Sequence, residues 1–568
     1  MQLAVACAGT AMVCASAPTR ASSDALVVRY PGEGARIGAV AASFALGSAP
    51  PGSTVSVNGV PALVAPDGGW TAYVPFSPGR FVLHVRATDG AWSDSLDRTI
   101  DVDSGAIAAF PADTTIVQPG ESIQLAVTAP AGATVSADGP GFSGIALTAH
   151  AELGPGAYAT TINAPLHPAG PARVVYHVAV ASSAPGLPAA LATDMKSAAT
   201  LEIASRPVLF VADVIRYAPG REAGMRPYAM LSPSLTADTD LTLPERTQLA
   251  VTGRFDNQLR VAMPGAAPEF VDLQAVKPEP GSQDLPEARI ASVSLSDEPK
   301  NTKLVIHVLG ARPAFRVIEN DEASGTVFVY GAGAAAASSG IPFHLPQRAF
   351  YGYRSRWEGD DLVLTFRKPP PFGARPQAAL SGLLIVVDPG HSPDTGAIGP
   401  IGTQERDVNL DISKRLTALL RSLGARVVMT RTTSKPVLLY DRPALAERIG
   451  ADLLISVHNN APPDGINPAT FHGYSVYYYQ PHSFALARSI HDAYRERIGI
   501  PDNGLHKGDL ALVRTSEMPS VLTESAFITW PWEEIRLRDP AFRQKLAETM
   551  SFGMERWAER MRNLEQNR

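Results

Sequence analysis

The sequence contains almost no cysteine. Only Cys7 and Cys14 occur in 568 residues, and both lie in a short apolar stretch at positions 3–17. If this stretch is removed as a leader, the mature chain has no thiol, which excludes disulfides and thiolate metal sites. Any metal ion must then be held by histidine, aspartate or glutamate.

Charge and long apolar runs are also scarce. Charged residues make up 18% of the chain and the net charge is −6. Because nucleic-acid-binding proteins carry a basic surface, we expect no nucleic-acid partner. A bilayer-spanning helix needs about 20 apolar residues. No run after the leader is that long and free of charge, so we expect no transmembrane segment in the mature chain.

Residues 1–23 are similar to a signal peptide, with an apolar run that ends in small residues. The usual basic start is missing, since no lysine or arginine precedes Arg20. The leader predicts export, to the periplasm, the cell envelope or the medium. A lipid anchor on Cys7 is a further option, although only six residues precede it.

The sequence patterns in the first half of the chain predict β-structure. Short alternating runs such as TVSV (54–57) and FVLHV (81–85) are separated by Pro, Gly, Asn and Asp turns. A weak repeat relates PPGSTVSVNG (50–59) to PAGATVSADG (130–139). We therefore predict an immunoglobulin-like β-sandwich over residues 26–105 and a second β-sandwich over 106–205.

Two further β-rich segments follow. Residues 206–280 contain two strands around Asp256-Asn257 and predict a small SH3-like domain. Residues 286–368 contain more strands and are interpreted as a β-rich targeting-type module. A Pro-rich linker over 369–380 then separates these modules from the rest of the chain.

After the linker the pattern changes to alternating strands and helices. Apolar strands are predicted at 383–388, 425–430, 453–457 and 520–524, and an amphipathic helix that ends at Gly424 lies between the first two. This order predicts a C-terminal α/β domain with a mostly parallel sheet and helices on both faces. Functional residues are then expected at the carboxyl ends of the strands.

Four ionisable residues occupy such positions. His391 and His458 follow or end predicted strands, Glu405 precedes a helix, and Glu524 ends the last strand. Two imidazoles and one carboxylate form a common catalytic zinc shell. A second carboxylate nearby can act as general base and acid.

Seven sequence pieces around these residues occur in one order. They are DPGH (388–391), GAIGPIG with Glu405 (396–405), DVNL (407–410), TR (430–431), SVHNN (456–460), GYSVYYY (473–479) and MPSVLTES (518–525). With these pieces, residues 381–565 resemble the catalytic domain of the zinc-dependent N-acetylmuramoyl-L-alanine amidases, the cell-separation amidase family. Ser392-Pro393 stand where that family usually has two glycines, and Thr523 and Ser525 flank Glu524 where apolar or small residues are usual.

The resemblance implies one Zn²⁺ per catalytic domain, bound by His391, Glu405 and His458, with Glu524 as general base and acid. It implies hydrolysis of the amide bond between N-acetylmuramic acid and L-alanine in peptidoglycan. Peptidoglycan is the expected partner, with an activator at the division site as a further option. The short segment between His458 and Gly473 lacks the blocking helix of some members, which predicts an enzyme that is not gated in cis.

Substrate-binding residues are less defined by the sequence. Asn460, His506 and Arg431 are candidates, while Arg431 fits loop ordering equally well. His491 lies in a helical pattern and is expected at the surface.

Two other functions stay open. One is a catalytically inactive scaffold that binds peptidoglycan. The other is a different zinc amidohydrolase or peptidase, although the absence of HExxH makes a peptidase less favoured.

Overall fold

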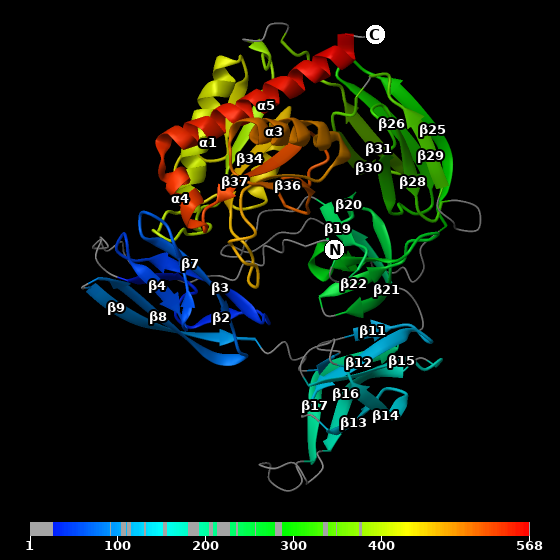
Figure 1. Ribbon diagram of the computed structural model, residues 1–568. Helices are drawn as coiled ribbons and strands as arrows, with labels where there is room; N and C mark the ends of the chain where they lie inside the picture. The colour runs from blue at the N-terminus through cyan, green and yellow to red at the C-terminus, as the bar shows by residue number, and fades with distance from the viewer. Residues whose placement is uncertain are drawn as a thin grey trace.

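The computed structural model describes residues 26–90, 92–103, 109–110, 115–129, 132–150, 156–167, 169–179, 192–203, 208–212, 228–234, 237–255, 257–278, 287–332, 339–347, 349–373 and 378–566. The predicted leader, with Cys7, lies outside these ranges. Most of the N-terminal two thirds is β-structure and the C-terminal third combines strands with helices (Figure 1). The predicted order of all-β modules followed by an α/β domain is therefore confirmed.

The first module consists of two facing sheets. One contains β1 (Val27–Tyr30), β3 (Ala42–Ser48), β7 (Gly69–Pro75) and β6 (Leu63–Val64), and the other β2 (Ala35–Ile37), β9 (Trp92–Val102), β8 (Gly79–Asp89), β4 (Thr54–Val57) and β5 (Val60–Pro61). Alternate residues of the strands point between the sheets, where Trp70, Leu83 and Ile100 are fully buried.

A second set of strands has its own core around Leu125 and Tyr176. It comprises β10 (Ala109–Phe110), β11 (Thr115–Val117), β12 (Ser122–Thr128), β13 (Thr134–Gly139), β14 (Phe142–Ala149), β15 (Ala157–Asn163), β16 (Ala169–Ala179) and β17 (Ala192–Ile203). The two copies of the weak repeat fall on β4 and β13. β4 pairs with β5 and β8, and β13 pairs with β14 and β16.

The next two segments share one hydrophobic core. The first contains β18 (Val208–Ala212), β19 (Tyr228–Ser232), β20 (Leu241–Pro244), β21 (Gln248–Phe255), β22 (Gln258–Val261), β23 (Glu269–Asp272) and β24 (Val276–Pro278). The second contains β25 (Arg289–Asp297), β26 (Asn301–Leu309), β27 (Phe315–Glu319), β28 (Ser324–Val329), β29 (Ser339–His344), β30 (Tyr353–Glu358) and β31 (Asp361–Arg367). Trp357 of β30 donates a hydrogen bond to Thr247 across the boundary, so the segments expected at 206–280 and 286–368 pack as one unit.

The C-terminal domain is built on a six-stranded sheet. Its strands, in spatial order, are β33 (Arg426–Met429), β32 (Leu384–Pro389), β34 (Leu453–Asn460), β37 (Ser520–Phe527), β35 (Tyr474–Tyr478) and β36 (Asp502–Lys507). The pair β35–β37 is antiparallel and the other four pairs are parallel.

The side-chain alternation of β32 separates two cores. Ile385 and Val387 face a cluster that includes α1 (Glu405–Ser422), α3 (Phe484–Arg497) and α5 (Pro540–Gln566). Val386 faces the opposite cluster, which includes α2 (Asp441–Arg448) and the segment 510–518. Described helices therefore cover both faces, with α1, α3 and α5 on one side and α2 on the other.

Local sequence explains where α1 begins and ends. Glu405 and Asp407 stand in its first turn, where carboxylates favour the positive end of the helix dipole. Gly424 follows its C-terminus with φ +89°, a left-handed conformation that favours glycine. None of the described helices combines the length and apolar character needed to cross a membrane.

Candidate metal centre

Three ionisable side chains lie at the carboxyl edge of the C-terminal sheet. His391 follows β32 by two residues, His458 lies near the end of β34, and Glu405 is the first residue of α1. Because β32 and β34 are parallel neighbours, their ends bring both histidines to one edge. The three predicted ligands therefore come from three different elements of one domain.

A single carboxylate lies between the two imidazoles. Glu405 Oε2 is 2.9 Å from His391 Nε2, and Glu405 Oε1 is 3.1 Å from His458 Nδ1. One ligand atom from each residue lies within 4.8 Å of the other two. This donor set matches the protein ligands of catalytic zinc sites, which leave one position for water or substrate.

The Glu405 carboxylate is buried and held in one orientation. It accepts hydrogen bonds from the backbone N–H groups of Ala397 (2.9 Å) and Asn459 (3.1 Å) and from Asn409 Nδ2 (3.0 Å). Burial raises the pKa of Glu405, but the two imidazoles hold it well below its usual range. The carboxylate is therefore ionised and preoriented, as a metal ligand has to be.

His391 is oriented by a second carboxylate. Its Nδ1 lies 2.5 Å from Asp394 Oδ1, which leaves Nε2 directed at Glu405. Burial lowers the pKa of His391, but the Glu405 and Asp394 carboxylates raise it to about 10. A cation that binds here must therefore displace a proton from this imidazole. A Cβ on Gly396 would lie 2.6 Å from the His391 ring, so this close approach requires glycine.

Glu524 lies next to these residues on β37. Its Cα is paired with that of His458 across the parallel β34–β37 ladder. Its Oε2 atom is buried and has no hydrogen-bond partner among the residues that the structure describes. Burial and the Glu405 carboxylate hold the pKa of Glu524 well above its usual range, and His391 opposes them. An unpartnered carboxyl oxygen beside a candidate metal site is available to exchange protons with water.

Two buried arginines hold the loop that carries His391. The Arg431 guanidinium donates to the carbonyl oxygens of Pro389 (2.9 Å) and Gly390 (2.7 Å). Arg442 donates to the Asp388 carboxylate at 2.9 Å and to the His391 carbonyl at 2.7 Å. Arg431 is 4% exposed, so the structure places this substrate-binding candidate inside the loop, where it orders the backbone.

The other two substrate-binding candidates, Asn460 and His506, are not among the three clustered residues. Asn460 is two residues beyond His458 and uses its Oδ1 to accept the N–H of Ala461 at 2.8 Å. His506 lies on β36, the edge strand, where Nε2 is 2.6 Å from the Asn503 carbonyl oxygen. β37 and β35 separate that strand from β34.

The expected surface position of His491 is wrong. This residue is 7% exposed, and its Nε2 lies 2.9 Å from Asp502 Oδ1. It packs against Tyr474, with 5.4 Å between the ring centroids. The helical pattern of α3 predicted the helix but not that β35 and β36 cover this position.

The first β-sandwich contacts both loops that flank the metal-ligand cluster. The hydroxyl of Tyr30 donates to Asp464, and Tyr73 Oη donates to the Gly465 carbonyl at 2.7 Å, in the loop after His458. Gly69 lies against Pro400 and Ile401, in the loop between the ligands His391 and Glu405. These contacts join segments that are about 400 residues apart in the chain.

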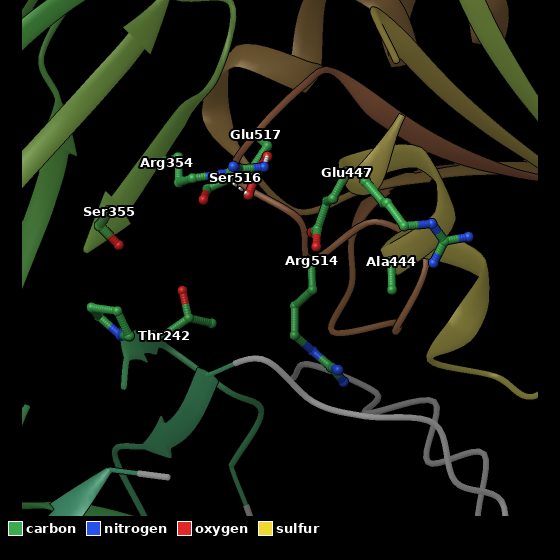
Figure 2. A pocket seen from close by; sticks show the side chains of 10 residues that line it. Thr242, Arg354, Ser355, Ala444, Glu447, Arg514, Ser516 and Glu517 are labelled. Atoms are coloured by element: carbon green, nitrogen blue, oxygen red, sulfur yellow. Dashed lines mark hydrogen bonds and ion pairs between the residues drawn. The ribbon is translucent and has the colours of Figure 1, made fainter. Parts of the chain in front are cut away.

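A cavity of about 350 Å³ lies at another junction, between β20, β30 and α2 (Figure 2). Two of its charged groups, Arg354 and Glu517, pair with each other. Arg354 forms two hydrogen bonds with Glu517, at 2.7 and 2.6 Å, and Glu447 Oε1 accepts from Thr515 at 2.7 Å. None of the three predicted metal ligands lines this cavity.

Several supporting residues were missed in the sequence. Asp388 belongs to the DPGH motif, and Asn409 lies one helical turn after Glu405, on the same face of α1. Asp388 could have been recognised because it is part of the motif, and Asn409 because it lies one helical turn from a predicted ligand. The sequence indicated Asp394 and Asn459 less clearly, because only their closeness in sequence to His391 and His458 distinguishes them.

The C-terminal domain matches known amidases. Residues 385–556 match the Amidase_3 family, described as N-acetylmuramoyl-L-alanine amidase. The chain is 34% identical over 173 residues to N-acetylmuramoyl-L-alanine amidase LytC of Bacillus subtilis, a match that covers 30% of this chain and 35% of LytC. It is 30% identical over 181 residues to the probable cell wall amidase LytH of Staphylococcus epidermidis, covering 31% of this chain and 59% of LytH. The match thus spans less than two thirds of the length of each of these two relatives.

Other relatives are matched over most of their length. The N-acetylmuramoyl-L-alanine amidase AmiA of Salmonella typhimurium is 31% identical over 219 residues, which covers 30% of this chain and 74% of AmiA. Among solved structures, AmiC2 of Nostoc punctiforme is 35% identical and is covered to 99%, over 32% of this chain, with a TM-score of 0.30. Through its C-terminal domain, the chain belongs to the Amidase_3 family of N-acetylmuramoyl-L-alanine amidases.

Proposed function

We propose that the protein hydrolyses the amide bond between N-acetylmuramic acid and L-alanine in peptidoglycan. The observation that carries this proposal is the cluster of His391, Glu405 and His458 with Glu524 on the adjacent strand. Family membership supports peptidoglycan as the proposed substrate, because the matched family and relatives are named N-acetylmuramoyl-L-alanine amidases.

We infer that the cluster holds one zinc ion. Its two imidazoles and one buried carboxylate fit the coordination preference of Zn²⁺. When bound, zinc supplies a Lewis acid that polarises a carbonyl group and acidifies water. Asp394 and Asn409 orient the ligands His391 and Glu405 from outside the cluster.

In this proposal Glu524 moves the proton. Its buried carboxyl oxygen takes a proton from the attacking water and delivers it to the departing amine. Arg431 and Arg442 keep the His391 loop in place during the reaction through their bonds to its carbonyl oxygens. Asn460 and His506 remain candidates for contacts with substrate.

The other modules are proposed to place the enzyme in the envelope. We propose an immunoglobulin-like fold for residues 26–105 and a second sandwich for 106–205. We propose an SH3-like fold for 206–280 and a targeting role for 286–368, which share one hydrophobic core. The leader over residues 1–23 supports export, to the periplasm or the outer envelope, with Cys7 as an optional lipid site. A division-site activator is an additional proposed partner.

The function is tested by incubating the purified protein with peptidoglycan and identifying the products by mass spectrometry. We expect free stem peptides that begin with L-alanine and glycan strands of unchanged length. Chelation should abolish the release, and added Zn²⁺ should restore it. His458→Ala should lose the bound zinc measured by elemental analysis, while the matched variant His491→Ala should keep it.

Other products would contradict the proposal. Peptide fragments cut within the stem would indicate a peptidase. Bound zinc with no released peptide would indicate a scaffold, or an enzyme that needs an activator. A more than tenfold gain in activity after removal of the β-modules would show gating in cis.

A further inference from the structure

Three aromatic rings form a stacked row beside the proposed active site. The rings of His472 and Trp530 are 4.8 Å apart and nearly parallel, at 20°. Trp532 continues the row, with its ring 4.9 Å from Trp530 and tilted by 37°. Aromatic pairs at these distances stabilise one another beyond the area they bury, so the row holds its outermost ring in a defined position.

A buried carboxylate fixes the base of this row. Glu533 is 3% exposed, and its Oε1 lies 2.7 Å from His472 Nδ1. Its Oε2 accepts the backbone N–H groups of Phe527 (2.6 Å) and Gly473 (3.3 Å). The His472 ring is therefore anchored to the ends of β37 and β35, and the two tryptophans stack outward from it.

The row lies at the same edge of the sheet as the metal-ligand cluster. Trp530 comes three residues after β37, the strand that carries Glu524. Glu534 of α4 (Pro531–Arg538) accepts the N–H groups of Ile401 (2.9 Å) and Thr403 (3.1 Å). Because Ile401 and Thr403 belong to the loop between the ligands His391 and Glu405, α4 and its Trp532 are tied directly to the proposed active site.

Trp532 also differs from the other tryptophans in its exposure. The structure describes all six tryptophans, and Trp532 alone exposes more than a third of its surface, at 38%. Leaving an indole in water forgoes the free energy of burying it. A preoriented, exposed indole next to a catalytic edge therefore indicates a surface that is covered when substrate binds.

We propose that Trp532 forms a glycan subsite, on which a sugar ring next to the cleaved muramoyl residue stacks. This inference rests on the proposed function, because the muramoyl amide cannot approach the cluster without its neighbouring sugars. The apolar C–H face of a pyranose packs on an indole, while its hydroxyls remain in water. The subsite adds affinity for the polymer and takes no part in the chemistry.

Binding is measured by calorimetry with peptide-free glycan strands as the probe, which requires no hydrolysis. We expect Trp532→Ala and Trp532→Gln to raise Kd by about tenfold and Trp532→Phe to raise it less. Phe484→Ala is the matched control, since Phe484 is 37% exposed on α3, and it should leave Kd unchanged. Thermal unfolding confirms that each variant is folded.

Hydrolysis provides a second readout. With polymeric peptidoglycan, Trp532→Ala should raise KM by about tenfold and leave kcat unchanged. With a single muramoyl-peptide that has no flanking sugar, both constants should match the wild type. An unchanged Kd in both truncation variants, or an equal loss with the single muramoyl-peptide, would overturn the subsite.

The two proposals fail in distinguishable ways. If the wild type binds glycan through Trp532 but releases no stem peptide, the amidase proposal fails and the subsite stands. If it releases stem peptides and Trp532→Ala binds and cleaves the polymer normally, the subsite fails and the amidase proposal stands.

Discussion

Glu524 and Glu447 are half-buried carboxyl groups in two regions of the same domain. Glu524 lies on the sheet edge that carries His391, Glu405 and His458, and Glu447 lies at the junction with the β-modules. Burial raises the pKa of both, for Glu447 to about 7. Their surroundings differ. Among the residues that the structure describes, Glu524 Oε2 has no hydrogen-bond partner, whereas Glu447 accepts a hydrogen bond from Thr515 at 2.7 Å beside the cavity of Figure 2.

The comparison shows what a raised carboxyl pKa signifies. Burial penalises the charged form wherever the group lies, so the raised value by itself reports on the environment and not on function. The cluster of His391, Glu405 and His458 next to Glu524 is what supports its proposed role in proton transfer. Three experiments test this distinction, from the largest expected effect to the smallest.

Glu524→Gln should reduce kcat for stem-peptide release by about a thousandfold, because the amide cannot accept and return a proton. Glu447→Gln is the matched control, an identical change in a carboxyl of the same domain. We expect it to keep the wild-type kcat, and both variants to retain zinc by elemental analysis. Equal losses of kcat in the two variants would break the comparison.

The third carboxylate, Asp388, sharpens the comparison because it is fully buried yet keeps its charge. Burial raises its pKa, but Arg442 at 2.9 Å lowers it below its usual value. Arg442→Ala leaves this charge unpaired and should lower the free energy of unfolding by about 3–5 kcal/mol in urea titrations. Arg415→Ala, which breaks a half-exposed pair with Asp411, should cost about 0.5 kcal/mol or less. Similar losses in both would contradict the role of Arg442.

The pH dependence of stability provides the smallest effect. Because the pKa of Glu447 rises from 4.5 to about 7 in the folded protein, the fold binds its proton more tightly than the unfolded chain does. The corresponding stability is present below pH 4.5 and is lost as pH rises through 7. Glu447→Gln removes this loss. The change that it causes in the free energy of unfolding, measured in urea, should therefore be more stabilising at pH 8 than at pH 5 by about 1–3 kcal/mol. An equal effect at both pH values would show that Glu447 does not titrate in this range.

Much of the C-terminal domain could be predicted from local patterns. Apolar spacing and Gly424 predicted a helix where α1 lies, and the apolar runs predicted β32, β33, β34 and β37. Because parallel strands bring their carboxyl ends to one edge, the same patterns placed His391, Glu405 and His458 together. The structure has these three within 4.8 Å, and their role as zinc ligands stays a prediction.

Other features had no local signal. The apolar spacing of α3 does not show that β35 and β36 cover His491, and the sequence WPW at 530–532 does not show that His472 stacks beneath it. Likewise, the segments expected to be separate at 206–280 and 286–368 share one core.

The sequence by itself determined the α/β domain, its family and the residues at the metal-ligand edge, because hydrophobic periodicity and short motifs act over a few residues. Only the tertiary structure decided that the first β-sandwich contacts the loop after His458, that Arg431 is buried in the His391 loop and that Trp532 is exposed on a helix bonded to the segment between His391 and Glu405. The physical reason is that these features depend on contacts between distant segments, such as Tyr30 with Asp464, which are 434 residues apart. No pattern within either segment specifies its partner.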